Sequence, residues 1–406
     1  MLYRVLEDKM EKYFVDLHVH IGRSEDNKPI KITAARSLNF ANIANECVNR
    51  KGINIVGIVD CGSPYVQQDI EKFLENGEAY EIPEGGIIYK ESLCIILGSE
   101  IETVEQREDG KMGSAHNVCF FPTLKDIKGF SEEMKQYIKN ITLSSQRSTL
   151  SAKQLLHIVE KYNGFLMPAH CFTPHKSFYG NCTDRLKKIF TDEYDKIFCV
   201  ELGLSSDTFL ADKISELEAK TFVTNSDAHS LPKIAREYNV VQMEHISFKE
   251  LVKALKREDG RGIVSNYGLD PKLGKYHRTF CEKCEKNVNL PAPALSCPDC
   301  DSKNITTGVF DRIEVIKDKE DSKSPDIRPQ YVYQIPLQFI PGIGNKTICK
   351  LIDYFGTEMN ILHKATFDDI ESVVGEKYAQ LIMDAREGKL RVIEGGGGIY
   401  GKVAGC

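Results

Sequence analysis

The sequence predicts an α/β protein in which a barrel of seven β/α units precedes a four-cysteine module and a small helical region. Residues 13–246 alternate short apolar runs with amphipathic stretches, as expected of strands that are covered by helices. Two Cys-x-x-Cys pairs follow at 281–300, and a Pro-Gly-Ile-Gly turn at 341–344 precedes another amphipathic stretch. We therefore expect three domains, over residues 1–268, 269–330 and 331–406.

Seven apolar runs supply the expected strands. They are Tyr13–His20, Ile53–Asp60, Leu93–Ile101, His116–Phe121, Phe165–His170, Ile197–Leu202 and Thr221–Ser226. Helices are expected between them, for example at 33–50, 151–162 and 208–219. Near-continuous apolar strands separated by helices favour a parallel sheet with both faces covered. Seven such units fit a closed or nearly closed barrel better than a small open sheet.

Composition and charge limit the possible functions. The chain is 41% hydrophobic and 28% charged, and it has no apolar run of about 18 residues that would predict a membrane helix. No signal peptide is evident, and we expect a cytoplasmic protein. Its net charge of −6 leaves no basic excess, so DNA binding would depend on local sites and metal ions. Cys94, Cys119 and Cys199 lie in apolar runs, which indicates buried, reduced thiols.

Acidic and histidine side chains gather at the ends of the expected strands. The residues that end or follow an apolar run are Asp60, Glu100, His170, Glu201 and Asp227. In a barrel these ends meet on one face, where active sites lie. His18 and His20 are two residues apart in a strand, so they point to the same side and can share one ion. Strand ends are generally more polar than strand middles, so only the whole set indicates a site.

The whole set predicts a metal centre. Its candidate ligands are His18, His20, Asp60, Glu100, His116, His170, Asp227 and His229. Zn²⁺ and Mn²⁺ accept both imidazole and carboxylate ligands. Glu100 could bridge two ions, and two ions about 4 Å apart activate a water and clamp both oxygens of an in-line phosphoryl displacement. Catalytic roles are assigned to Asp227, His229, Glu100 and Asp60. Of these, Asp60 and His229 would either bind a third ion or support the other ligands without contacting an ion.

Several motifs resemble known families. Asp-Leu-His-Val-His at 16–20, Gly-Ser-Glu-Ile-Glu at 98–102 and Asn-Ser-Asp-Ala-His at 225–229 resemble those of the PHP superfamily of phosphoesterases. This resemblance implies a distorted seven-unit barrel with two or three metal ions. More narrowly, residues 168–180 and 200–207, followed by the cysteine module and a Gly-rich tail, resemble the endonuclease Q family.

The resemblance implies a metal-dependent endonuclease of DNA repair. It would cut the phosphodiester 5′ of a deaminated base, uracil or hypoxanthine, with xanthine and abasic sites as further candidates, leaving 3′-hydroxyl and 5′-phosphate ends. The implied cofactors are two or three divalent ions (Zn, Mn or Mg), and the implied partner is DNA containing a deaminated base. Cys61 stands where many PHP phosphatases have a His, and 22–24 hold no further His. A third ion would therefore bind weakly through Asp60, His229 and water, or its site would be empty.

The cysteine module has zinc-ribbon spacing. Its members are Cys281, Cys284, Cys297 and Cys300. Four thiolates leave no open position on a tetrahedral ion, so the expected zinc is structural. The segment has too little apolar content to fold without it.

The segment from Gln338 has a helix-hairpin-helix pattern. Gly342 and Gly344 allow a close backbone approach, and the following helix would offer free N–H groups to a phosphate, with Lys346 and Thr347 adjacent. A weaker second copy is expected at 366–390, where Thr366 is an N-cap with Asp369 at N3 and Gly375 lies between two helices. This second copy could instead pack on the barrel. The Gly-rich tail from Glu394 could be a flexible end or a loop that DNA approaches.

The lesion pocket is assigned to the segment after His170. Its candidate residues are Cys171, Phe172, His175, Phe178, Tyr179 and Gly180. The aromatic rings could stack on an extruded base, and Gly180 would let backbone amides approach it. Uracil and hypoxanthine both present an N–H beside a C=O, so one donor–acceptor pair could accept both and reject cytosine and adenine. The same rings could instead cap the barrel core.

Two other functions are compatible with the sequence. A small-molecule phosphatase of the PHP type would not need the cysteine module or the hairpin. An inactive DNA-binding scaffold would bind one zinc, through the cysteines only.

Overall fold

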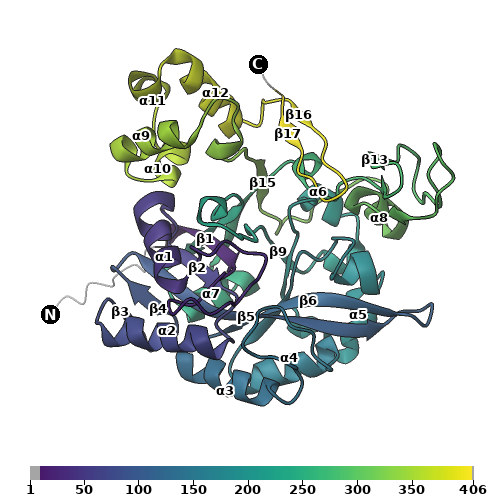
Figure 1. The fold of residues 1–406 in the computed structure, drawn as a ribbon, viewed down its shortest axis with the longest axis horizontal. Helices are drawn as coiled ribbons and strands as arrows, with labels where there is room; N and C mark the ends of the chain where they lie inside the picture. Colours follow the sequence, from purple (N-terminus) through teal and green to yellow (C-terminus); the bar gives the residue numbers. More distant parts are fainter. Residues whose placement is uncertain (1–9, 405–406) are drawn as a thin grey trace.

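One large mixed sheet runs through the computed structural model, which describes residues 10–404 (Figure 1). Its strands are β1 (Glu11–Val19), β2 (Ile55–Ile58), β3 (Ala79–Glu81), β4 (Ile87–Tyr89), β5 (Leu93–Gln106), β6 (Met112–Phe121), β7 (Phe165–Pro168), β10 (Tyr238–Met243), β11 (Gly262–Gly268) and β15 (Gln330–Tyr333). A separate parallel pair consists of β8 (Cys199–Glu201) and β9 (Thr221–Val223). All seven expected runs therefore contain a strand.

The expectation of a parallel sheet was wrong, because the sheet is mixed: its centre and the edge pair β11–β15 are parallel, and the other pairs are antiparallel. β1, β2 and β5 are parallel neighbours, whereas β5–β6–β7 and β1–β10–β11 are antiparallel. Residues 107–111 alone join β5 to β6, a link too short for a parallel crossover. The strands curl around a packed interior that includes Leu17, Ile96, Phe120 and Met167. Within residues 10–404 the strand pairing does not close into a ring, because β8 and β9 pair only with each other.

Helices cover the outside of the sheet. They are α1 (Phe40–Glu46), α2 (Pro64–Glu75), α3 (Leu124–Met134), α4 (Ala152–Lys161), α5 (Leu186–Phe190), α6 (Thr208–Ala211) and α7 (Phe248–Lys256). The helix expected at 151–162 is α4, which begins with a capping box between Ser151 and Gln154. The helix expected at 33–50 begins only at Phe40 and continues as a π-helix to Lys51. The helix expected at 208–219 ends after one turn, at Ala211. No helix of the described residues is long and apolar enough to cross a membrane.

The C-terminal third folds back onto the large sheet. The cysteine module has three short strands, β12 (Phe280–Cys281), β13 (Lys286–Asn287) and β14 (Ile305–Thr306), followed by α8 (Val309–Ile316). β15 then joins the large sheet beside β11, so the boundary expected at 330/331 falls within a sheet strand. Figure 1 shows a helical lobe made of α9 (Asn345–Phe355), α10 (Glu358–His363), α11 (Phe367–Val374) and α12 (Glu376–Arg386). The Gly-rich tail follows as a hairpin of β16 (Val392–Ile393) and β17 (Lys402–Val403).

Candidate metal centre

Two imidazoles and a carboxylate converge at the end of β1. The Nε2 atoms of His18 and His20 lie 3.3 Å apart. Asp227, from the loop after β9, places Oδ1 3.4 Å from His20 Nε2 and 3.7 Å from His18 Nε2. Asp227 has a φ of +43°, a left-handed conformation that is uncommon for a residue other than glycine. The three ligand atoms surround one point, as the ligands of a single ion do.

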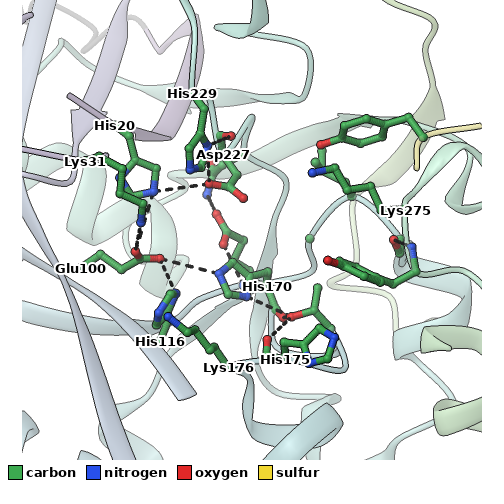
Figure 2. Close-up of a pocket in the computed structure, with 18 residues that line it drawn as sticks. His20, Lys31, Glu100, His116, His170, His175, Lys176, Asp227, His229 and Lys275 are labelled. Carbon is green, nitrogen blue, oxygen red and sulfur yellow. Dashed lines mark hydrogen bonds and ion pairs between the residues drawn. The ribbon is translucent and has the colours of Figure 1, made fainter. Parts of the chain in front are cut away.

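A second group forms around Glu100, as Figure 2 shows. Glu100 Oε1 lies 2.9 Å from His116 Nδ1 and 3.7 Å from His170 Nε2. The same carboxylate also faces the first group, with Oε1 3.5 Å from His18 Nε2 and Oε2 3.8 Å from His20 Nε2. Glu100 therefore lies between the two groups, where a carboxylate could bridge two ions.

These residues fit divalent cations. His116 is buried, and neither of its ring nitrogens has a hydrogen-bond partner, because the 2.9 Å approach to Glu100 is not directed along an N–H bond. Unpaired buried polar atoms are rare and call for a missing ligand. Burial lowers the pKa of His116 and favours the neutral ring that binds metals. Burial opposes a charge on His18, yet the carboxylates of Glu201, Glu100 and Asp227 raise its pKa well above the ordinary value, so the site attracts positive charge.

Buried carboxylates hold the two histidines of β1 from behind. Glu201 lies 3.0 Å from His18 Nδ1 through Oε1, and it also accepts hydrogen bonds from the His170 backbone N–H and the Asn225 amide. Such partners fix the ring orientation and the tautomer of a metal ligand. Glu201 was expected only as an acid at a strand end, and the structure gives it this positioning role.

Asp60 has the same role toward His20, which is one of the two positions expected for it. Its Oδ2 lies 3.1 Å from His20 Nδ1 and 2.6 Å from the Ile21 backbone N–H, and Oδ1 contacts the Ser144 hydroxyl. Both carboxylate oxygens of Asp60 therefore have partners on the side of His20 that faces away from the ligand group. Sequence alone cannot distinguish this position from a ligand position, because both require an acid at the end of a strand.

His229 stands at the edge of the centre. Its Nδ1 lies 3.0 Å from the Asp227 carbonyl oxygen, and its ring centroid is 4.6 Å from that of His20. Burial, together with the charge of His20, lowers the pKa of His229 to about 4, so the ring is neutral. His229 lines the cavity in front of the two ligand groups.

A cavity of about 240 Å³ opens over the metal-ligand groups. Its other wall comes from segments far away in the sequence, with Lys275 and Tyr276 from the start of the cysteine module and Tyr400 from the Gly-rich tail. Figure 2 shows Lys275 across the cavity from Glu100. The sequence prediction missed these residues and Lys31, because no local pattern marks them. The run of glycines from 395 to 398 was the one sequence feature that indicated an unusual backbone conformation in the tail.

The expected lesion pocket needs correction. Cys171, Phe172, Phe178 and Tyr179 are fully buried, and the rings of Phe172 and Tyr179 stack on each other at 5.0 Å within the core. They cannot stack on a base in this conformation. Gly180 packs so closely on the Thr173 carbonyl that a Cβ would lie 1.9 Å from that oxygen.

Of the segment after His170, only Thr173, His175 and Lys176 line the cavity. The aromatic content of this segment could not show whether its rings pack in the core or stack on a base, because both roles use the same side chains.

The four cysteine sulfurs lie within 4.8 Å of one another. Cys281 Sγ is 3.8 Å from Cys300 Sγ, and Cys284 Sγ is 3.9 Å from Cys297 Sγ, with no disulfide among them. The Cys284 backbone N–H lowers the pKa of Cys281 to about 7. This arrangement fits one tetrahedral ion with four thiolate ligands.

The Pro-Gly-Ile-Gly turn at 341–344, the hairpin of the first expected helix-hairpin-helix pattern, lies beside the loop that carries Asp227 and His229. Gln338 donates to the Pro232 carbonyl at 2.9 Å, and Leu231, Pro232, Gly344 and Asn345 line one hollow. Gly342 has a φ of +83° and packs on the Tyr378 ring of α12, whereas no atom lies within 4 Å of a Cβ added at Gly344. Lys346 is exposed and Thr347 is half-buried at the start of α9.

The second copy of the helix-hairpin-helix pattern, expected at 366–390, has the expected local structure. The capping box between Thr366 and Asp369 is present, and Gly375 separates α11 from α12.

Comparisons with known proteins cover nearly the whole chain. The uncharacterized protein YqxK of Bacillus subtilis is 45% identical over 97% of this chain and 100% of its own length. The solved lesion-specific endonuclease PfuEndoQ of Pyrococcus furiosus is 31% identical with a TM-score of 0.81, over 97% of this chain and 95% of that one. A solved complex of endonuclease Q with a 27-mer duplex that has an abasic lesion at the active site is also 31% identical, with a TM-score of 0.82, over 97% and 96%. The family model described as PHP-associated matches residues 207–259.

Proposed function

The chain belongs to the endonuclease Q family of metal-dependent DNA endonucleases, and we propose that it cuts DNA on the 5′ side of a deaminated or abasic nucleotide, leaving 3′-hydroxyl and 5′-phosphate ends. The observation that carries this proposal is the pair of ligand groups that share Glu100 beneath a cavity. An endonuclease needs such a centre beside a recess that can hold the nucleotide to be recognised.

Two divalent ions fit the centre. His18, His20 and Asp227 would hold one, His116 and His170 the other, and Glu100 would bridge them. When bound, such ions, zinc, manganese or magnesium, would supply activation of a water nucleophile and charge stabilisation at the leaving 3′ oxygen. A separate structural zinc would bind to the four cysteines.

The chain's own residues position the reaction. Glu201 and Asp60 hold His18 and His20 so that their Nε2 atoms face the centre. His229, neutral and at the cavity wall, can accept a proton at its free ring nitrogen. Lys176 lines the same cavity and places positive charge where the phosphate would lie.

The cavity also offers a place for the damaged base. A hollow of about 240 Å³ admits one extruded nucleotide and not a duplex. Its far wall includes Tyr276 and Tyr400, and the Lys275 ammonium lies 4.7 Å from the centre of the Tyr400 ring. Lysine is a donor only. It would therefore favour the carbonyl of uracil or hypoxanthine over the amino group that cytosine or adenine presents at the same edge.

The hairpin at 341–344 extends this surface. It lies next to the loop with Asp227 and His229, so its free amides at the start of α9 could hold the phosphate backbone beside the cut. The second hairpin around Gly375 would hold a more distant phosphate in the same way.

Two other functions lose support from the fold. A small-molecule phosphatase would not need Tyr400 of the tail in its cavity wall or β15 in its sheet. An inactive scaffold would not need two groups of metal ligands under a cavity, one of them with the unpaired ring of His116.

The test uses metal-loaded full-length protein and a panel of labelled duplexes. Each duplex carries one uracil, hypoxanthine, xanthine or abasic site at the same position, with an undamaged control and p-nitrophenyl phosphate as a phosphatase substrate. We expect cleavage of lesion duplexes only, abolished by EDTA. Hydrolysis of p-nitrophenyl phosphate without cleavage of any lesion duplex would contradict the proposal.

A further inference from the structure

Lys31 places a fixed positive charge at the metal centre. It lies on the loop after β1, and its Nζ is 3.1 Å from Glu100 Oε2, with a further contact to the Ser145 hydroxyl. The side chain is only 15% exposed. Its backbone is also held, because the Lys31 N–H donates to the Ile21 carbonyl at 3.0 Å. The ammonium therefore has one well-defined position.

The surroundings of this ammonium are those of a cation site. Ser145 contacts Glu100, and Ser144 contacts Asp60, while the two hydroxyls lie 3.0 Å apart. Ser145 has a φ of +51°, so the loop keeps an unfavourable backbone conformation in order to hold its side chain there.

Most of the donor atoms that could bind a third metal ion are engaged elsewhere. Both oxygens of Asp60 are occupied by His20, the Ile21 N–H and Ser144. The Cys61 thiol is buried and donates to the Ile58 carbonyl at 3.2 Å, and burial raises its pKa. The His229 Nδ1 lies 3.0 Å from the Asp227 carbonyl oxygen, which leaves only Nε2 of this ring free. One free imidazole nitrogen is too small a donor set to hold a third ion.

We propose that the Lys31 ammonium replaces a third metal ion, so that the centre works with two ions and one fixed side-chain cation. This inference depends on the proposed function only for the presence of the two ions. Lys31 lines the cavity, and a cation at this point can contact a phosphate oxygen of the bound strand while it fixes the Glu100 carboxylate. Unlike an ion, it cannot be lost to a chelator.

The test counts bound ions without measuring cleavage. The protein is loaded with Mn²⁺, and native mass spectrometry distinguishes manganese in the barrel from zinc on the cysteines. Four proteins are compared: the wild type, Lys31→Gln, Lys31→Glu and, as a matched charge reversal on the same loop, Lys28→Glu, whose side chain is exposed. We expect two manganese ions in the wild type, Lys31→Gln and Lys28→Glu, and three in Lys31→Glu, because a carboxylate there would recruit a cation.

Cleavage provides the second measurement, since Lys31→Glu could fail to fold. Lys31→Gln should retain its two ions and its melting temperature, and should cut lesion DNA about 10- to 100-fold more slowly. Lys28→Glu should cut at the wild-type rate. Three manganese ions in the wild-type barrel, or full cleavage by Lys31→Gln, would overturn the inference. If the wild type cuts no lesion DNA, the proposed function fails, while the ion counts still decide the role of Lys31.

Discussion

The carboxylate of Glu201 should control metal affinity through His18, although it touches neither ion position. The side chain is fully buried, and every partner is a donor: His18 Nδ1 at 3.0 Å, the Asn225 amide at 2.8 Å and the His170 N–H at 2.8 Å. Glu201→Gln keeps the shape but replaces one acceptor oxygen with an NH₂ group. In either amide orientation this group faces at least one of these donors.

The expected magnitude follows from that mismatch. One buried donor left without an acceptor costs about 1–3 kcal/mol. Loss of a carboxylate behind a metal-bound histidine typically costs about 10- to 100-fold in metal affinity, which corresponds to about 1.4–2.8 kcal/mol. Both estimates agree, so we expect the Mn²⁺ concentration for half-maximal cleavage to rise about 10- to 100-fold.

The assay is cleavage of a duplex with one abasic site, measured over a range of Mn²⁺ concentrations, beside calorimetric Mn²⁺ titration. Saturating metal should restore most of the rate to Glu201→Gln. Glu75→Gln, an exposed site on α2, serves as the control and should behave as the wild type. The reasoning is refuted if Glu201→Gln has an unchanged metal dependence, or if its activity stays lost when both ions are bound.

Four further substitutions test other parts of the structure. Asp227→Asn should lower lesion cleavage at least about 10²-fold and leave DNA binding intact by fluorescence anisotropy; a fully active variant would refute the metal assignment. Cys297→Ser should release one zinc per chain and destabilise the module, because the free energy of zinc binding contributes to the folding of this segment; an unchanged zinc count would contradict the four-cysteine site. Gly344→Val should fit the fold, since no atom lies within 4 Å of its Cβ, and should weaken binding to damaged and undamaged DNA alike; a loss confined to damaged DNA would exclude phosphate contact. Phe178→Ala should cost about 3–5 kcal/mol of stability in chemical denaturation, with lesion preference unchanged; a changed preference without destabilisation would return this ring to the pocket.

The sequence could place the residues of the candidate centre together because their signals are local. His18 and His20 are two apart in one strand, and the other acids and histidines end or follow apolar runs, so the fold only had to bring strand ends together. Burial of Cys94, Cys119 and Cys199 was confirmed for the same reason.

Features that depend on distant contacts were missed. Tyr400 reaches the cavity only because the tail folds back, and Arg236 then donates to its hydroxyl at 2.8 Å. Lys31 lies in a loop whose path no periodicity reveals. β10 was not expected, and it holds Asn239, whose buried amide links Val15 and Thr224. A polar residue within an apolar run weakens the strand signal, although here it ties neighbouring chain segments together.

The most direct test of the central claim is to map the cut in a duplex with a single uracil. The strand is labelled at one end and resolved against a sequence ladder, and mass spectrometry identifies both new ends. We predict one metal-dependent break immediately 5′ of the uracil, with a 3′-hydroxyl and a 5′-phosphate, and no break in Asp227→Asn. A break on the 3′ side, release of the base without a break, or a cut that persists in EDTA would contradict the account.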